Sequence, residues 1–319
     1  IPFQVYIDPA NPVAKIVIQG NEFVLREKEW SGWKKVRFSL IPTQSVHGMC
    51  LFYLREVRPK FKLYISSVHI DPARPALPLS TPESYARELE QRFGPYFTKG
   101  LPADTSALFN GVLDEEEFLE LDDMVLEESM AMLEYELARF NEGLLFFYFS
   151  SPDQRQHMFW RLTDPGHPAY DEKLAARYGD VIARIYGEMD KTLDMALRKA
   201  DKDTVVVAMS DHGFNTFRRG FNLNTWLRDN GYIEPPTCRG LLNPGRGRPV
   251  DWSRTKAYGL GLNGLYVNLK GRERDGLVDP SQRDVLLKEI TEKLLAVRDP
   301  LNNQPIIGRV YRAEEVYSG

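Results

Sequence analysis

The first 70 residues alternate apolar and polar side chains over short stretches. Runs such as VAKIVIQG, KKVRFSLI and FKLYISSV are rich in Val, Ile, Phe and Tyr, with polar residues between them. A period of two is typical of strands that bury one face. The pattern therefore predicts a β-rich accessory subdomain over residues 1–75. The proline-dense stretch DPARPALPLSTP that follows favours an extended connector, because proline cannot donate to a β-ladder.

Helical periodicity begins after this connector. Residues 83–93 are expected to form a helix, with Thr81 as its N-cap, Pro82 as its first residue and Gly94 as its stop. Residues 115–140 predict a second helix, and the acidic side chains of its first half suit the positive end of the helix dipole.

Two short apolar runs frame the middle of the chain, GLLFFYFS at 143–150 and DTVVVAMS at 203–210. Runs of this kind form strands that are buried on both faces. Residues 171–200 lie between them and carry one apolar stripe at helical spacing. Strand, helix and strand predict a right-handed parallel βαβ unit. Residues 76–319 are accordingly expected to form a partial α/β metal-binding domain, with a mainly parallel sheet flanked by helices.

The C-terminal third reads as a hairpin followed by a helix. TKAYGLGLNGLYVNL predicts two strands joined at Asn263 and Gly264, and residues 283–297 predict a last amphipathic helix.

Composition narrows the classes of function. Lys and Arg number 41 against 45 Asp and Glu, so the formal net charge of −4 provides no basic field to attract nucleic acid. The two cysteines, Cys50 and Cys238, lie in no metal-binding spacing and indicate no disulfide framework. No stretch approaches the roughly 20 apolar residues of a membrane span. These features favour a cytoplasmic location. Because the sequence begins with Ile1 rather than Met, an export signal that precedes it is left open.

Metal-ligand residues follow both predicted parallel strands. Asp153 and His157 come after the first strand and Asp211 and His212 after the second. The carboxyl ends of parallel strands share one sheet edge, where open α/β folds bind ligands. Residues four apart on a helix lie about 5–6 Å apart at Cβ, which suits chelation of one ion. Carboxylate and imidazole together favour a divalent ion such as zinc or manganese.

Simpler interpretations exist for each residue of this group. Asp153 and Asp211 could cap the segments that follow them, which would leave His157 and His212 as ordinary histidines. The coincidence of four such ligands at equivalent strand ends favours the metal site. Three further residues are candidate substrate contacts, although a solvated surface position is the more frequent role of such residues: His167, Arg218 and Arg219.

SSPDQRQHMFW together with VVVAMSDHGF resembles the type I phosphodiesterase/nucleotide pyrophosphatase family of the alkaline phosphatase superfamily. The resemblance is carried best by residues 143–235. It implies an alkaline-phosphatase-like α/β fold and two metal ions, one held by Asp153 and His157 and the other by Asp211 and His212. It also implies hydrolysis of a small phosphorylated substrate through a covalent intermediate on a Thr or Ser.

The sequence departs from that family's pattern in two places. The family's nucleophile region has no convincing match before residue 143, and no histidine follows His212. We therefore expect an internal portion of a longer protein, in which the nucleophile lies outside this segment and the segment alone is inactive. A sulfatase or phosphomutase relative on the same scaffold, and a non-catalytic binding or scaffold protein, are the alternative functions.

Overall fold

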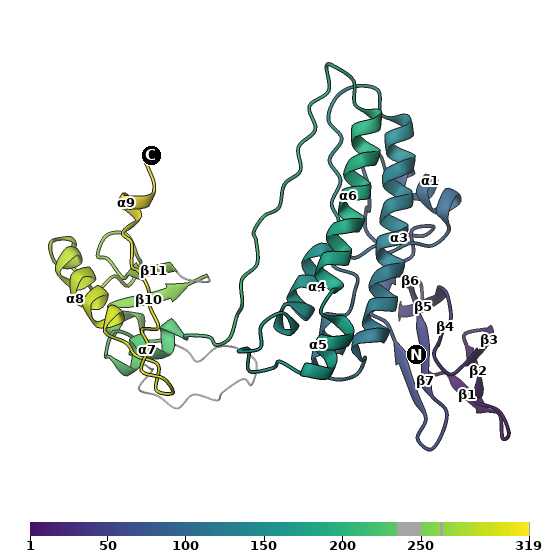
Figure 1. The fold of residues 1–319 in the computed structure, drawn as a ribbon, viewed down its shortest axis with the longest axis horizontal. Coiled ribbons are helices and arrows are strands. Elements are labelled where there is room, and N and C mark those ends of the chain that lie inside the picture. The colour runs from purple at the N-terminus through teal and green to yellow at the C-terminus, as the bar shows by residue number, and fades with distance from the viewer. Residues whose placement is uncertain (235–249, 262–263, 319) are drawn as a thin grey trace. The chain divides into compact units, whose positions relative to one another are not determined.

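The computed structural model describes residues 1–234, 250–261 and 264–318. Contacts between Cα atoms divide the chain into two compact units, Ile1–Arg218 and Arg219–Gly319, and each is described by itself. Figure 1 labels their helices and strands. Cys238 and Asn263 lie outside the described residues. The predicted division into 1–75 and 76–319 stays a prediction.

Short antiparallel strands form the N-terminal part of the first unit. They pair in the orders β1-β2-β3, β4-β7-β8 and β5-β6-β9. Their bounds are β1 Gln4–Ile7, β2 Val13–Ile18, β3 Asn21–Arg26, β4 Glu29–Trp30, β5 Lys34–Ile41, β6 Gln44–Cys50, β7 Phe52–Glu56, β8 Lys62–Ile65 and β9 His69–Ile70. The predicted β-rich character of this region is confirmed.

Alternation along the strands builds the first core. In β2 the side chains of Ala14, Ile16 and Ile18 are buried while their neighbours are only partly covered, as a period of two requires. They pack in one apolar cluster with Phe52 and Leu54 of β7. β7 buries Phe52, Tyr53 and Leu54 in succession, so its other face needs a further covering layer.

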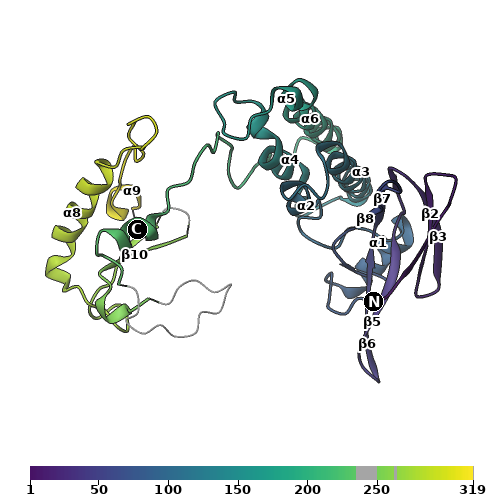
Figure 2. The same ribbon diagram turned by 90° about the horizontal axis from the view of Figure 1, so that it is seen from below.

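Helices provide that layer. They are α1 Glu83–Phe93, α2 Thr105–Phe109, α3 Glu115–Arg139, α4 Ser151–Phe159, α5 Glu172–Tyr178 and α6 Val181–Lys199. Tyr53 of β7 and Tyr64 of β8 share a core cluster with Leu121 of α3. Figure 2 shows the bundle of α2 to α6 from below, where α3 and α6 run side by side. A separate cluster joins Phe118 of α3 to Phe159 of α4.

The helix ends follow local sequence signals with two differences from expectation. Pro82, rather than Thr81, is the N-cap of α1, and the hydroxyl of Ser80 accepts the Ala86 N–H. Gly94 ends α1 with a positive φ of 80°, as expected. The predicted stripe over 171–200 is divided between α5 and α6, because the Gly179 and Asp180 pair interrupts the helical backbone.

Residues 143–150 and 203–210, both within the described part of the chain, form no hydrogen-bonded strand in the structure. Their side chains are largely uncovered: Leu144 is 91% exposed and Val205 is 84% exposed. A strand buried on both faces needs hydrogen-bonded neighbours and a covering layer. Neither segment has them among the described residues, and the named sheets there are antiparallel. The parallel βαβ pairing stays a prediction.

The second unit has its own core. It contains α7 Leu223–Asp229, β10 Ala257–Leu260, β11 Gly264–Val267, α8 Arg283–Leu295 and α9 Ala313–Val316. The predicted antiparallel pair is confirmed, with Ala257 opposite Val267. The predicted C-terminal helix is α8, and its Ile290 packs with Leu227 of α7.

Candidate metal centre

Helix α4 positions the first two predicted ligands. Ser150 is its N-cap and Pro152 lies in its first turn, where the ring costs no helical hydrogen bond. Asp153 therefore lies inside the first turn and is not the cap. One turn later, His157 Nε2 is 3.3 Å from Asp153 Oδ1. The expected pairing on one helix face is what the structure shows.

The segment after residue 210 provides the other two residues. His212 Nε2 lies 3.5 Å from Asp153 Oδ1 and 3.7 Å from Asp211 Oδ2. His212 Nδ1 lies 3.1 Å from the carbonyl oxygen of Gly213. Since a carbonyl only accepts, Nδ1 is the donor in this contact, and Nε2 is the ring nitrogen that faces Asp153.

The donor atoms of three of these residues fit a single cation. Ligand atoms of Asp153, His157 and His212 all lie within 4.8 Å of one another. One carboxylate oxygen and two imidazole nitrogens form a donor set that zinc and manganese accept. Asp211 is the outermost residue of the group, with its side chain 83% exposed. The structure thus brings Asp153, His157 and His212 together, with the Asp211 carboxylate beside His212. The role of all four as metal ligands stays a prediction.

Aromatic rings pack around the two histidines. The Phe214 ring meets the His157 ring edge to face at a centroid distance of 4.8 Å and the His212 ring at 5.2 Å. Its other contact is a stacked arrangement with Trp160, at 5.8 Å. Phe214 therefore packs against both imidazoles. The sequence analysis missed this role, although Phe214 directly follows the SDHG motif.

Tyr148 is a second residue that the sequence analysis did not single out. Partial burial raises the pKa of its phenol, and the charges of Asp153 and Asp211 raise it further. A phenol in this position remains protonated at neutral pH and keeps its O–H donor beside the carboxylates.

The three candidate substrate contacts have protein partners. Arg218 donates two hydrogen bonds to the Asp164 carboxylate, from Nε at 2.7 Å and from Nη2 at 2.9 Å. Arg218 holds the pKa of the Asp164 carboxyl at about 2, with help from the Gly166 N–H. His167 Nε2 lies 3.0 Å from the Phe217 carbonyl oxygen, so it ties the 164–170 loop to the segment after His212.

Arg219 belongs to the second unit, where it donates to Asp299 at 2.8 Å. Its role as a substrate contact stays a prediction, as do those of Arg218 and His167.

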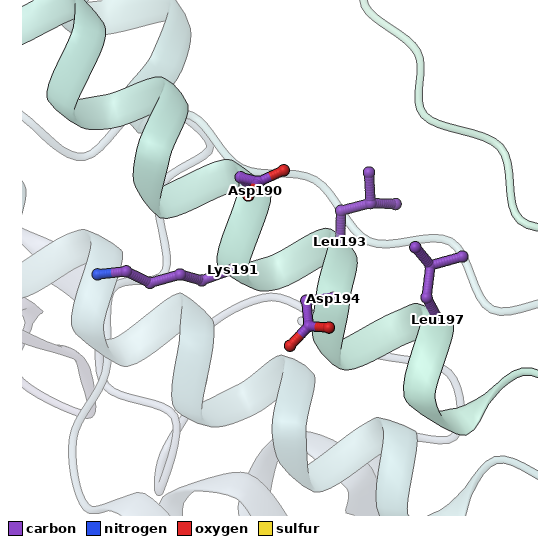
Figure 3. A pocket seen from close by; sticks show the side chains of 5 residues that line it. All are labelled: Asp190, Lys191, Leu193, Asp194 and Leu197. Atoms are coloured by element: carbon purple, nitrogen blue, oxygen red, sulfur yellow. The ribbon is translucent and has the colours of Figure 1, made fainter.

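A surface depression elsewhere does not resemble a ligand site. Its lining side chains all come from one stretch of α6 (Figure 3): Asp190, Lys191, Leu193, Asp194 and Leu197. Specific ligand sites bring polar groups from several elements to one point. We therefore assign no ligand to this depression.

No helix among the described residues is long and apolar enough to cross a membrane.

Comparisons with curated proteins and with solved structures gave no match. The sequence model of the family described as type I phosphodiesterase / nucleotide pyrophosphatase matches residues 19–319. The match covers nearly the whole chain and includes the Asp153, His157 and His212 cluster. The chain therefore belongs to the type I phosphodiesterase / nucleotide pyrophosphatase family, a family of metal-dependent phosphoester hydrolases with an alkaline-phosphatase-like α/β fold.

Proposed function

We propose that this protein, in a longer form that carries the nucleophile, hydrolyses a phosphoester of a small molecule with divalent ions held by Asp153, His157, Asp211 and His212. The observation that carries the proposal is the convergence of Asp153, His157 and His212 within 4.8 Å, on residues that family membership covers.

The proposal includes two ions, with zinc preferred and manganese as the second choice. Asp153 and His157 would hold one ion, and Asp211 and His212 would hold the other. The contact of 3.5 Å between His212 Nε2 and Asp153 Oδ1 supports adjacent sites, because it brings one ligand of each pair together. When bound, such ions stabilise negative charge on phosphoryl oxygens and on the leaving group.

The chain's own residues have complementary tasks in this proposal. Gly213 sets the tautomer of His212, so that Nε2 is available as a ligand atom. Phe214 packs against both imidazoles and is itself stacked on Trp160, so this aromatic contact favours one arrangement of the two rings. The hydroxyl of Tyr148 is a donor for an anionic substrate oxygen, since its phenol stays protonated.

The two alternatives are a relative that runs another reaction on the same scaffold and a non-catalytic scaffold protein, and they make different predictions. A sulfatase relative would prefer an aryl sulfate, and a phosphomutase relative would transfer phosphate without net hydrolysis. A scaffold protein would turn over no substrate with any metal. No observation on the described residues favours either alternative over a phosphoesterase.

The test is hydrolysis of bis(p-nitrophenyl) phosphate, p-nitrophenyl phosphate and p-nitrophenyl sulfate by the metal-stripped full-length protein that contains this chain, before and after addition of zinc or manganese. We expect release of nitrophenol from a phosphate ester only with metal, together with two bound ions per chain by elemental analysis. Absence of metal uptake and turnover would contradict the proposal, and turnover of the sulfate alone would favour the sulfatase.

A further inference from the structure

The buried face of α4 carries polar residues that the proposed chemistry does not use. Ser151 and Arg155 are one turn apart on this helix, and both donate to the carboxylate of Asp122 on α3. Asp153 and His157 lie two positions further along. At 100° per residue, two positions correspond to about 200°, so the ligand pair occupies the opposite face of the same helix.

The contacts to Asp122 are direct and closed to solvent. Ser151 Oγ is 3.0 Å from Asp122 Oδ1, and Arg155 Nε is 2.5 Å from Asp122 Oδ2. The side chains of Arg155 and Asp122 are 6% and 0% exposed. The Arg155 guanidinium also reaches Asp123 at 2.5 Å. Buried charges require such partners, because an unpaired charge in the interior is strongly unfavourable.

This network fixes the rotation of α4 about its own axis. The helix has nine residues, and apolar contacts alone tolerate small rotations better than directional hydrogen bonds do. With side chains about 5–6 Å from the axis, a rotation of about 30° moves a ligand atom by about 3 Å. Productive geometry at functional sites tolerates about 0.5 Å. The orientation of the ligand pair therefore depends on the contacts at the opposite face.

We propose that Asp122 and Arg155 are positioning residues, which set the rotation of α4 so that Asp153 and His157 face His212. The inference rests on the proposed function for the identity of the metal site. Neither positioning residue is one of the proposed metal ligands. Loss of either one changes the geometry of the site through the helix that carries the ligands.

The first measurement needs no metal. The chain has five histidines, so the imidazole signals of His157 are resolvable by NMR. In the wild type we expect a cross-relaxation signal between the rings of His157 and Phe214, whose centroids are 4.8 Å apart. Arg155→Met should reduce this signal by at least about fivefold, because α4 loses the guanidinium hydrogen bonds to Asp122 and Asp123 that set its rotation.

The second measurement is metal affinity, by competition of zinc with a chromophoric chelator. Loss of an outer residue that orients metal ligands typically weakens binding by about 10-fold to 100-fold. We expect this change in Kd for Arg155→Met and for the double variant Asp122→Leu/Arg155→Met. Arg155→Lys keeps the positive charge and lacks the planar guanidinium that donates to both Asp122 and Asp123. Its Kd should lie between those of the wild type and Arg155→Met.

A matched control separates positioning from stability. Arg55→Met breaks the Arg55 and Glu117 ion pair, which anchors β7 to the same helix α3 and does not involve α4. This variant should lower the melting temperature and leave both the ring signal and the zinc Kd unchanged. The double variant should be more stable than Arg155→Met, because it removes the unpaired Asp122 charge. Its affinity for zinc should remain weakened.

Two results would overturn the inference. One is a ring signal of wild-type strength in both Arg155→Met and the double variant. The other is a zinc Kd of these two variants within about twofold of the wild-type Kd. If the wild type binds no zinc, the proposed function fails and the ring signal still decides the inference. If Arg155→Met does not fold, Arg155→Lys and the double variant are decisive by the same two measurements.

Discussion

The carboxylate of Asp153 lies between two imidazoles, with His157 on its own helix and His212 on a distant segment. Asp211 joins this group from the outside and Phe214 packs against both rings. Single side chains in this cluster therefore differ in what they contribute, and substitutions can separate the contributions.

Substitution of the ligands should remove most of the hydrolysis. Asp211→Asn or His212→Ala takes one donor from an ion whose charge stabilises the oxygens of the displacement, so we expect a loss well beyond 100-fold in kcat/KM. The measurement is zinc-dependent release of nitrophenol from an aryl phosphate diester. Wild-type turnover in both variants would show that these residues do not carry the chemistry.

Arg218→Met should have a smaller effect than either ligand substitution. Asp164 already engages Nε and Nη2 of this guanidinium, so we expect Arg218 to orient the substrate and to take no part in the chemical step. We expect a loss on the order of 10-fold to 100-fold, about 1.4–2.8 kcal/mol, mostly in KM. A loss as large as that of His212→Ala would mean that Arg218 takes part in the chemical step.

The pKa of the Asp164 carboxyl should lie below its ordinary value. Hydrogen bonds from Arg218 and from the Gly166 N–H lower its pKa from 3.8 to about 2. A depressed pKa means that the ion pair is fully formed above pH 3.8 and is lost as the pH falls through about 2. Carboxyl NMR should show this midpoint, and Arg218→Met should move it back toward 3.8. An identical midpoint in both proteins would contradict the assignment.

At the scale of elements, α3 is the common support of the first unit. It packs on β7 and β8 through Leu121, on α4 through Phe118, and begins with a capping box between Asp114 and Glu117. The Glu128 carboxylate on this helix accepts the Phe97 N–H at 2.9 Å and ties the loop after α1 to α3. Burial of Glu128 raises its pKa to about 7.

This raised pKa predicts a pH-dependent stability. The native state holds the Glu128 proton more tightly than the unfolded chain, whose pKa is near 4.5. The stabilisation is therefore present below pH 4.5 and is lost as the pH rises through about 7. Relative to Glu128→Gln, we expect the unfolding free energy of the wild type to fall by about 3 kcal/mol between pH 4.5 and 8. Urea unfolding of both proteins at several pH values measures the difference, and parallel curves would contradict it.

At the scale of the whole molecule, the two units have separate apolar cores. Leu227 is fully buried in the second unit and packs there with Tyr232 and Ile290. The candidate metal centre lies entirely in the first unit, since its four residues precede Arg219. Stability and metal chemistry should accordingly respond to different substitutions.

Leu227→Ala should destabilise the second unit alone. The cavity that it leaves is expected to cost about 2–5 kcal/mol of local stability. Hydrogen exchange should show faster exchange in α7 and α8 and unchanged protection in α3 and α4. Equal loss of protection in both units would show that they unfold as one.

Several features could be predicted from local sequence. Period-two alternation indicated the N-terminal strands, and the spacing of Asp153 and His157 placed both on one helix face. Gly94 marked a helix end because only a residue without Cβ adopts its backbone conformation freely. These signals are local, since each depends on residues within one or two turns or a few strand positions.

The tertiary structure decided which distant residues meet. The sequence offers no local signal that Arg155 pairs with Asp122, that Phe214 packs against two imidazoles, or that Arg218 pairs with Asp164. Apolar composition alone also could not establish that 143–150 and 203–210 pair as strands, because a strand requires a hydrogen-bonded neighbour. Periodicity reveals which face of an element is buried, whereas the partner of each buried charge or ring depends on how the elements pack together.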